Sequence, residues 1–273
     1  MAEIEAVSSS EMIDRLGELG NPPVWSLVIT VFGDSVMPRG GVVSASALSS
    51  IFHRLSIRGE ALRVALHRLA KDGWIVRHRL GRNSHYALSD IGRAKFLPAS
   101  RRIYAIAPVL NGPWRLVALR RPPHPETAMS EAGFLQLSPT LFLGPRQAGE
   151  PPANREAIVG DVRHLPDWAR SALAPEPLQL DYRRLHSVLS EQMATLQTAS
   201  GLEPLDAVGL RTLLVHHWRR LLLRHADLPA DVMPEGWRGE DCRGLVLALH
   251  EALSRSADPW LDGAIGPRVT HRP

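Results

Sequence analysis

The hydrophobic positions in the first third of the chain recur at helical spacing and then switch to the alternation of strands. The pattern predicts three helices, a strand, a turn and a second strand, in that order, at residues 22–32, 45–55, 58–71, 74–79, 80–83 and 84–88. Ser44 precedes the second helix and is suited to cap it. Three short helices followed by a β-hairpin is the order of a winged helix-turn-helix domain. We place this domain at residues 21–97, after a loose or marginally helical lead-in at residues 1–20.

The rest of the chain changes character twice. Twelve of its 22 prolines lie between Pro108 and Pro177, and proline excludes long helices from most of that region. Three strand-like runs stand within it, at residues 114–119, 135–143 and 157–162. These runs predict a small α+β domain over residues 98–177. From Leu180 onward, leucines at helical spacing predict a helical C-terminal domain over residues 178–273.

Positive charge is concentrated in the predicted winged helix. The chain has 273 residues and a net charge of +4, yet residues 51–95 alone carry +7, against −4 before them and +1 after them. Of the 32 basic residues 30 are arginine, which fits either a GC-rich codon habit or the bidentate reading of phosphates and guanines. A near-neutral chain with one basic segment is typical of a nucleic-acid-binding module attached to other domains.

The third helix has the face that a DNA-reading helix needs. Its inward face gathers Ala61, Leu62, Ala65 and Leu69. In a major groove Arg63 would pair with guanine or phosphate, Val64 would touch a thymine methyl, and Arg68 would reach a flanking phosphate. The alternative is a solvated helix on which Arg63 and Arg68 pair with Glu60 and Asp72. The candidate DNA contacts of this segment are Arg58, Arg63, Val64, His67, Arg68 and Lys71.

The hairpin adds a second cationic group. Three arginines and two histidines, His78 among them, crowd two short strands and their turn. Like charges this close repel one another unless an anion neutralises them. The pattern therefore favours double-stranded DNA as the partner. The candidate contacts of the wing are Arg77, Arg79, Arg82, Asn83 and His85.

At this point several segments resemble one family. Residues 26–41 (SLVITVFGDSVMPRGG) and 62–93 (LRVALHRLAKDGWIVRHRLGRNSHYALSDIGR) resemble the PaaX family of bacterial transcriptional repressors. Residues 101–104 are similar to the family's Arg-Ile-Tyr link, and residues 133–145 (GFLQLSPTLFLGP) to its central domain. Residues 215–239, with a histidine, an arginine pair, Leu-Pro and Pro-x-x-Trp, resemble its C-terminal signature.

The resemblance spans roughly residues 21–260 and implies both a fold and a function. The implied fold is a winged helix, a central ferredoxin-like α+β domain similar to a small CRISPR-associated nuclease, and a helical C-terminal domain. The implied function is that of a homodimeric repressor of an aromatic-acid catabolic operon. The family pattern also implies release from operator DNA by an aromatic acyl-CoA such as phenylacetyl-CoA, without a bound cofactor. Residues 120–129 depart from the family because prolines break the helix expected there.

The candidate effector site lies in the C-terminal signature. Arg220 and Arg224 are four apart on one helix face, where they either clamp the phosphates of a CoA ester or bridge to acidic residues of a neighbouring helix or subunit. A histidine and a tryptophan in the same segment are either ligand contacts or packing residues. The candidate effector residues are His216, Arg219, Arg220, Arg224 and Trp237.

The sequence gives little support for a catalytic function, so we expect that the protein is not an enzyme. No carboxylate follows residues 114–119, where a metal-dependent nuclease would hold its ion. Cys242 is the only cysteine, and His216 and His217 point about 100° apart on a helix, so we expect no metal site. The acidic N-terminus and short apolar runs predict a cytoplasmic protein without a membrane segment. The alternatives kept are a constitutive architectural DNA binder without effector and a metal-dependent nuclease.

Overall fold

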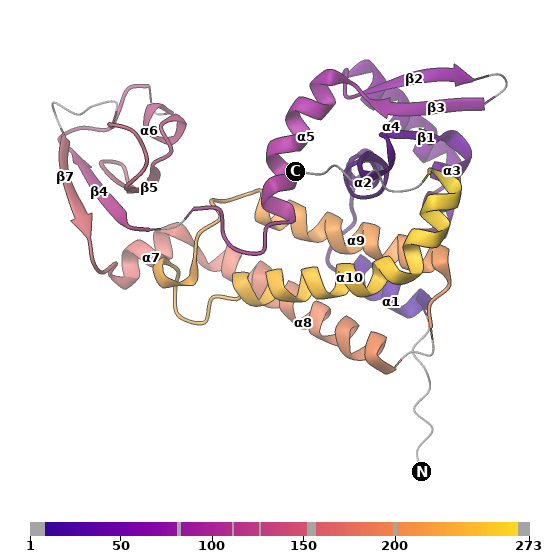
Figure 1. Cartoon of the computed structure of the whole chain (residues 1–273). Coiled ribbons are helices and arrows are strands. Elements are labelled where there is room, and N and C mark those ends of the chain that lie inside the picture. The colour runs from indigo at the N-terminus through magenta and orange to yellow at the C-terminus, as the bar shows by residue number, and fades with distance from the viewer. Residues whose placement is uncertain are drawn as a thin grey trace, which may run out of the picture.

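A computed structural model of the chain describes residues 9–80, 83–110, 112–125, 127–151, 157–198 and 201–266 (Figure 1). The structure combines helices with two separate antiparallel sheets, which confirms the predicted α+β class. The first sheet has three strands in the order β1-β3-β2, and the second has four in the order β5-β6-β4-β7. Figure 1 shows the second sheet at one end of the molecule and the hairpin β2–β3 at the other.

The first helix, α1 (Ser9–Gly17), is a packed element rather than a loose lead-in. Met12, Ile13 and Leu16 share one face and are buried against α8 and α9. Of the loose or marginally helical lead-in expected at residues 1–20, residues 9–17 are helical. The sequence did not reveal their packing, because the partner of this short apolar face lies far away in the sequence.

The predicted three helices are present. They are α2 (Val24–Val31), α3 (Ala45–Arg54) and α4 (Gly59–Lys71). The first starts two residues later than predicted and continues as a π-helical turn over Phe32–Val36 and a 3₁₀ turn over Met37–Arg39. Gly40, with a φ of 85°, reverses the chain there. Ser44 caps α3, as predicted, by accepting a hydrogen bond from the Ala47 amide.

The predicted hairpin is also present, as β2 (Ile75–Leu80) and β3 (Asn83–Leu88). The strands are antiparallel, with His78 opposite His85. A short strand that the sequence did not reveal, β1 (Val42–Ser44), pairs with the other edge of β3. The helix α5 (Asp90–Ile103) follows, so it runs across residue 97, where the sequence placed a domain boundary.

The second sheet contains the predicted strands of the middle region. Its elements are β4 (Trp114–Leu119), α6 (Ala128–Glu131), β5 (Leu135–Ser138), β6 (Leu141–Pro145), β7 (Ala157–Val162) and α7 (Asp167–Leu173). The strand β4 lies in the centre, between β6 and β7. Gly144 is required in β6, because a Cβ there would stand 2.5 Å from the Phe134 ring. The helix α6 spans only four residues, in line with the proline-rich departure noted above.

Three long helices form the last part of the described chain: α8 (Glu176–Thr198), α9 (Pro204–Leu222) and α10 (Gly239–Ala264), with a 3₁₀ turn at Ala230–Val232. The helix α9 is buried along most of its length and packs on α10, α1, α2 and α3. One hydrophobic core joins residues from Met12 to Leu261 and includes the buried faces of α3 and α4. Within the described residues, no helix has the length and apolarity needed to cross a membrane.

A buried charge network fastens the π-helical turn to α9 and α10. Arg211 donates to Asp34 at 2.8 Å, and Tyr104 and His250 also contact this carboxylate, at 2.9 and 2.7 Å. Burial alone would raise the pKa of Asp34, but the Arg211 guanidinium and the hydrogen bond from His250 hold it well below its ordinary value. Arg39 adds ion pairs to Asp258 and Asp262 on α10.

Candidate nucleic-acid interface

The helix α4 presents one apolar and one cationic face. Its core face buries Leu62, Ala65, Leu66 and Leu69, which extends the predicted inward face by one leucine, while Ala61 is half-buried. The predicted contact residues all lie on the exposed part of the helix and at its start. They are Arg58, Arg63, Val64, His67, Arg68 and Lys71. Val64 is 63% exposed, so its apolar side chain is available on this face.

The charges of this face remain largely uncompensated. In the part of the chain that the structure describes, Arg63 and Lys71 form no ion pair, so the predicted alternative pair between Arg63 and Glu60 is absent. Arg68 stands 3.6 Å from Asp72, and both side chains are exposed. The Arg68 guanidinium also lies over the Trp25 ring, 5.6 Å from its centre. Sequence reasoning missed Trp25, which is 38% exposed on α2, because nothing in the sequence distinguishes it from the apolar residues around it.

The hairpin turns two arginines to the same side. Arg77 and Arg79 lie opposite Tyr86 and Ser84, so they share one face of the ribbon, while His78 and His85 share the other. Both arginines are exposed, and Arg77 donates to the Ser84 hydroxyl at 2.7 Å. Asn83 is exposed and His85 is half-buried. Arg82, the remaining predicted contact of the wing, lies outside the described residues.

The two cationic elements are neighbours in space and in sequence. A link of three residues, 72–74, joins α4 to β2, and the elements pack on each other. In Figure 1 the hairpin projects from the body of the molecule at the end where α4 lies. The acidic groups of residues 51–95 number three against ten basic groups. At this end of the molecule a helix and a two-stranded ribbon therefore carry an excess of positive charge, which suits binding to the phosphate backbone of DNA.

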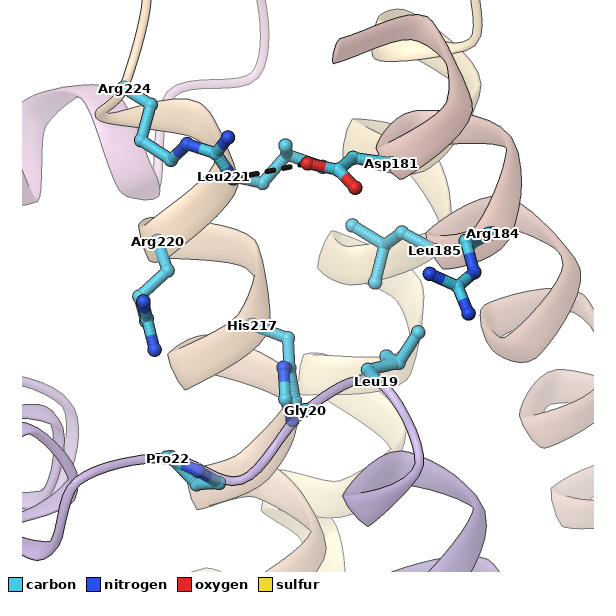
Figure 2. Close-up of a pocket in the computed structure, with 10 residues that line it drawn as sticks. All are labelled: Leu19, Gly20, Pro22, Asp181, Arg184, Leu185, His217, Arg220, Leu221 and Arg224. Atoms are coloured by element: carbon cyan, nitrogen blue, oxygen red, sulfur yellow. Dashed lines mark hydrogen bonds and ion pairs between the residues drawn. The ribbon is translucent and has the colours of Figure 1, made fainter. Parts of the chain in front are cut away.

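A cavity of about 240 Å³ lies between α8, α9 and the link from α1 to α2 (Figure 2). Its lining includes Arg184 of α8 and both His217 and Arg220 of α9. Arg224, just after the end of α9, also lines it. Figure 2 shows these side chains around a common space, with Asp181 joined to Arg224. The lining of the cavity thus holds three arginines and one carboxylate.

The charge balance of this cavity is positive. Arg224 pairs with Asp181 at 3.1 Å, which is the bridge to a neighbouring helix that the sequence left as one of two readings. Arg184 and Arg220 form no ion pair with any described residue. Burial, together with the nearby Arg220 charge, lowers the pKa of His217 to about 4, so this imidazole is neutral at pH 7. Sequence reasoning missed Arg184, whose signal was its place one helical turn after Asp181.

The other predicted effector residues lie elsewhere. His216 is fully buried, and its Nδ1 lies 3.2 Å from the Thr30 hydroxyl of α2. Arg219 donates to Thr30 at 2.8 Å and to the Ser26 carbonyl at 2.7 Å. Both side chains therefore turn toward α2, away from Arg220. The helical rotation of 100° per residue explains why neighbours in sequence serve different faces.

Trp237 occupies a third place. Its ring centre lies 4.3 Å from that of Tyr182 and 6.0 Å from that of His225. The Tyr182 hydroxyl in turn lies 2.7 Å from His225 Nε2. The structure brings Arg220 and Arg224 together in one cavity but does not bring Trp237 or His216 to them.

Among the described residues no three His, Cys, Asp or Glu side chains gather as a metal site would require. The rings of His216 and His217 are perpendicular, with centres 5.5 Å apart. The strand β4 ends at Leu119 and is followed by Arg120 and Arg121 rather than a carboxylate.

Comparison with known proteins matches the chain to one family. The family model described as "PaaX-like protein" matches residues 24–92, and the model "PaaX-like protein C-terminal domain" matches residues 175–263. Together the two matches cover more than half of the chain. The chain is 29% identical to "Transcriptional repressor PaaX" of Escherichia coli (strain K12), over 85% of this chain and 81% of that protein. It also resembles the structure "Uncharacterized protein Rv0674 from Mycobacterium tuberculosis", with 18% identity, a TM-score of 0.44, and coverage of 80% of this chain and 91% of that one.

Proposed function

The chain belongs to the PaaX-like protein family, and we propose that it is a transcriptional repressor that binds double-stranded operator DNA through α4 and the hairpin β2–β3. The protein is a regulator, and its family is not one of enzymes. The observation that carries the DNA-binding proposal is the exposed and uncompensated charge of Arg63, Lys71 and Arg79 on the elements within the first family match.

In this proposal residues 21–97 are a winged helix-turn-helix domain and α4 is its reading helix. Arg63 pairs with a guanine or a phosphate, and Val64 contacts a thymine methyl. Arg77, Arg79 and Arg82 hold the flanking backbone through the wing. The exposure of Val64 supports this role, since a contact with an apolar methyl group would explain an exposed valine on a charged face.

The remaining domains are proposed to carry regulation. Residues 98–177 form a ferredoxin-like domain, a reading supported by the strand order with β4 between β6 and β7. Residues 178–273 form a helical domain, and the protein is a homodimer whose two reading helices match an inverted repeat. The DNA-binding and helical parts share one core, which connects α9 to α4 through α2 and α3.

An aromatic acyl-CoA, phenylacetyl-CoA or a relative, is the proposed effector. The cavity at Arg220 and Arg224 is the proposed site of its phosphates, because it holds three arginines and one carboxylate. Arg184 joins them from α8. An effector that binds the DNA-free state more tightly releases the operator by mass action. Genes for aromatic-acid breakdown are the proposed targets.

A DNA titration tests the proposal. The full chain is titrated with labelled DNA from upstream of aromatic-acid genes near its own gene, against unrelated competitor DNA, with and without phenylacetyl-CoA. We expect specific binding that phenylacetyl-CoA reverses, and reversal at higher effector concentration in the variant Arg220→Ala with Arg224→Ala. Binding that no acyl-CoA in a panel reverses would favour an architectural DNA binder without effector. Absence of specific binding to any such DNA would contradict the repressor itself.

A further inference from the structure

A second cavity, of about 210 Å³, lies where the DNA-binding elements meet the C-terminal helices. We call it the junction cavity. Its walls come from α2, α5, α9 and the base of the hairpin, and Figure 1 shows α5 running between the hairpin and α9. The residues that define it for the argument below are Trp74, Phe96, Ala99, Tyr104, Val215 and Arg219.

The walls of the junction cavity are mainly apolar and aromatic. Trp74 and Leu88 form the hairpin side, Phe96 and Ala99 the α5 side, and Val215 the α9 side. For scale, an apolar cavity of roughly 150 Å³ suffices to bind benzene in a protein interior. The junction cavity is therefore large enough for one ring and a short side chain.

One strong cation lines this apolar space. Arg219 gives its Nε and one terminal nitrogen to Thr30 and Ser26, and within the described chain it has no carboxylate partner. Burial lowers the pKa of Arg219 to about 10, so the group is still charged at pH 7. A largely buried charge without a counter-ion is costly, and an anion supplied from outside would offset that cost.

The other charged groups at the cavity do not supply that anion. Asp34 lines it but already contacts Arg211, Tyr104 and His250. Lys95, the second cation of the lining, lies over the Trp74 ring at 4.9 Å. The cavity thus combines an aromatic wall with an excess of positive charge.

We propose that the junction cavity binds a compact apolar carboxylate, a single ring with a short acid chain, with the ring against Trp74 and Phe96 and the carboxylate on Arg219. The site differs from the arginine cavity of Figure 2, which lies on the opposite face of α9, where Arg220 points. The two adjacent arginines therefore serve two different pockets.

The position of the cavity gives its ligand a lever on DNA binding, a consequence that rests on the proposed function. Trp74 lies in the link between α4 and β2, and Leu88 ends β3, so a ligand in the cavity touches the base of the hairpin directly. On the other side the ligand touches α9. Occupancy fixes the hairpin relative to the C-terminal helices, and we expect it to weaken operator binding by about fivefold or more.

Calorimetric titration of the full chain with phenylacetate tests the site without DNA. We expect binding, and binding at least about tenfold weaker for the neutral isostere phenylacetamide, because a charge-assisted hydrogen bond is lost. Ala99→Phe, which fills the cavity, and Arg219→Met, which removes the cation, should each weaken phenylacetate binding by a similar factor. The matched control is Arg146→Met, an exposed arginine of the four-stranded sheet that lines neither cavity, and it should change the affinity less than about twofold.

Every other result of these titrations would contradict one part of the proposal. Equal affinity for phenylacetate and phenylacetamide would remove the role of Arg219, and Ala99→Phe with unchanged affinity would place the ligand elsewhere. Ala99→Phe keeps the test decisive if Arg219→Met does not fold. Binding of phenylacetyl-CoA that Ala99→Phe abolishes, without binding of the free acid, would show a thioester site instead. Failure of the repressor proposal would appear separately, as loss of specific DNA binding with the calorimetric result intact.

Discussion

The arginines of this chain fall into two physical classes. Arg39, Arg211 and Arg243 are buried, and each donates to acids or carbonyls of a distant segment. Arg63 and Arg79 are exposed and, within the described residues, pair with no acid. The first class holds the fold together, while the second keeps its donors available for an external anion. The codon habit suggested by the composition cannot by itself produce this division.

Two histidines of α9 make the stability of the protein depend on pH. Burial lowers the pKa of His216 to about 2 and that of His217 to about 4, against 6.5 in the unfolded chain. Below pH 6.5 the unfolded state therefore binds more protons than the folded state. The free energy of unfolding consequently decreases as the pH is lowered. For His216 alone we expect a loss of about 2 kcal/mol between pH 7 and pH 5.

Urea unfolding at pH 7 and pH 5 measures this loss. The variant His216→Leu removes the titrating group, so its free energy of unfolding should fall less between the two pH values, by that same amount. Only the difference between pH values matters, because the substitution also changes the contact with Thr30. An identical pH dependence in the wild type and the variant would mean that His216 is protonated in the folded state.

Sequence reasoning at the residue scale succeeded where helix geometry alone decides. Spacing of four placed Arg220 and Arg224 on one face, and both line the same cavity. It could not group Arg184 with them, because that contact depends on how α8 packs against α9. His216 and Trp237 were grouped with them by position in a motif, and the structure places each in a different environment.

At the scale of elements, α4 and the hairpin form one functional unit. The three-residue link between them fixes the hairpin beside the helix, and β1 closes the other side of β3. A ribbon with two exposed arginines on one face is suited to hold a phosphate backbone while a helix reads the groove. Each phosphate contact releases counterions, so the salt dependence of binding counts such contacts.

Arg79→Ala tests the role of the hairpin. If Arg79 contacts a phosphate, the slope of the logarithm of the binding constant against the logarithm of salt concentration should become shallower by about one unit. The matched control is Arg146→Ala, an exposed arginine that pairs with Asp161 in the four-stranded sheet. Binding constants measured at salt concentrations from about 50 to 300 mM give the slopes of both variants. Equal slopes for the two variants and the wild type would mean that Arg79 of the hairpin does not contact the DNA backbone.

Elements with a clear period were predictable, and those defined by distant partners were not. The strands β4 and β7 and the hairpin were located from alternation and turn residues alone. The strand β1 escaped because three residues carry no detectable period, and its identity depends on pairing with β3. The burial of α1 likewise depends on α8 and α9.

At the scale of the whole molecule, the buried carboxylate of Asp34 connects the beginning and the end of the chain. Its partners are Arg211 of α9, His250 of α10 and Tyr104 after α5. This single group therefore joins the segment that leads into the DNA-binding elements to α10 and to α9, which lines part of the proposed effector site. The predicted domain boundaries at residues 97 and 177 stay predictions, while the core runs across the first and last of the predicted domains.

Asp34→Asn tests this connection. Asp34→Asn removes one of the two carboxylates that contact the buried Arg211 and leaves only Asp258, at 2.8 Å, so we expect the free energy of unfolding to fall by about 3 kcal/mol, the low end for a broken buried pair. Asp181→Asn breaks the exposed pair with Arg224 and should cost less than about 1 kcal/mol. Urea unfolding at pH 7 compares the two. A similar small cost for both would mean that the Asp34 network does not hold the two parts together.

The central claim is that α4 reads DNA, and the affinity of Arg63→Ala for the operator tests it most directly. Titration at one fixed salt concentration compares the wild type, Arg63→Ala and the control Arg146→Ala on specific and on unrelated DNA. We expect Arg63→Ala to lose about 1–3 kcal/mol on the operator and far less on unrelated DNA, while Arg146→Ala matches the wild type on both. Operator affinity of Arg63→Ala equal to that of the wild type would contradict the claim.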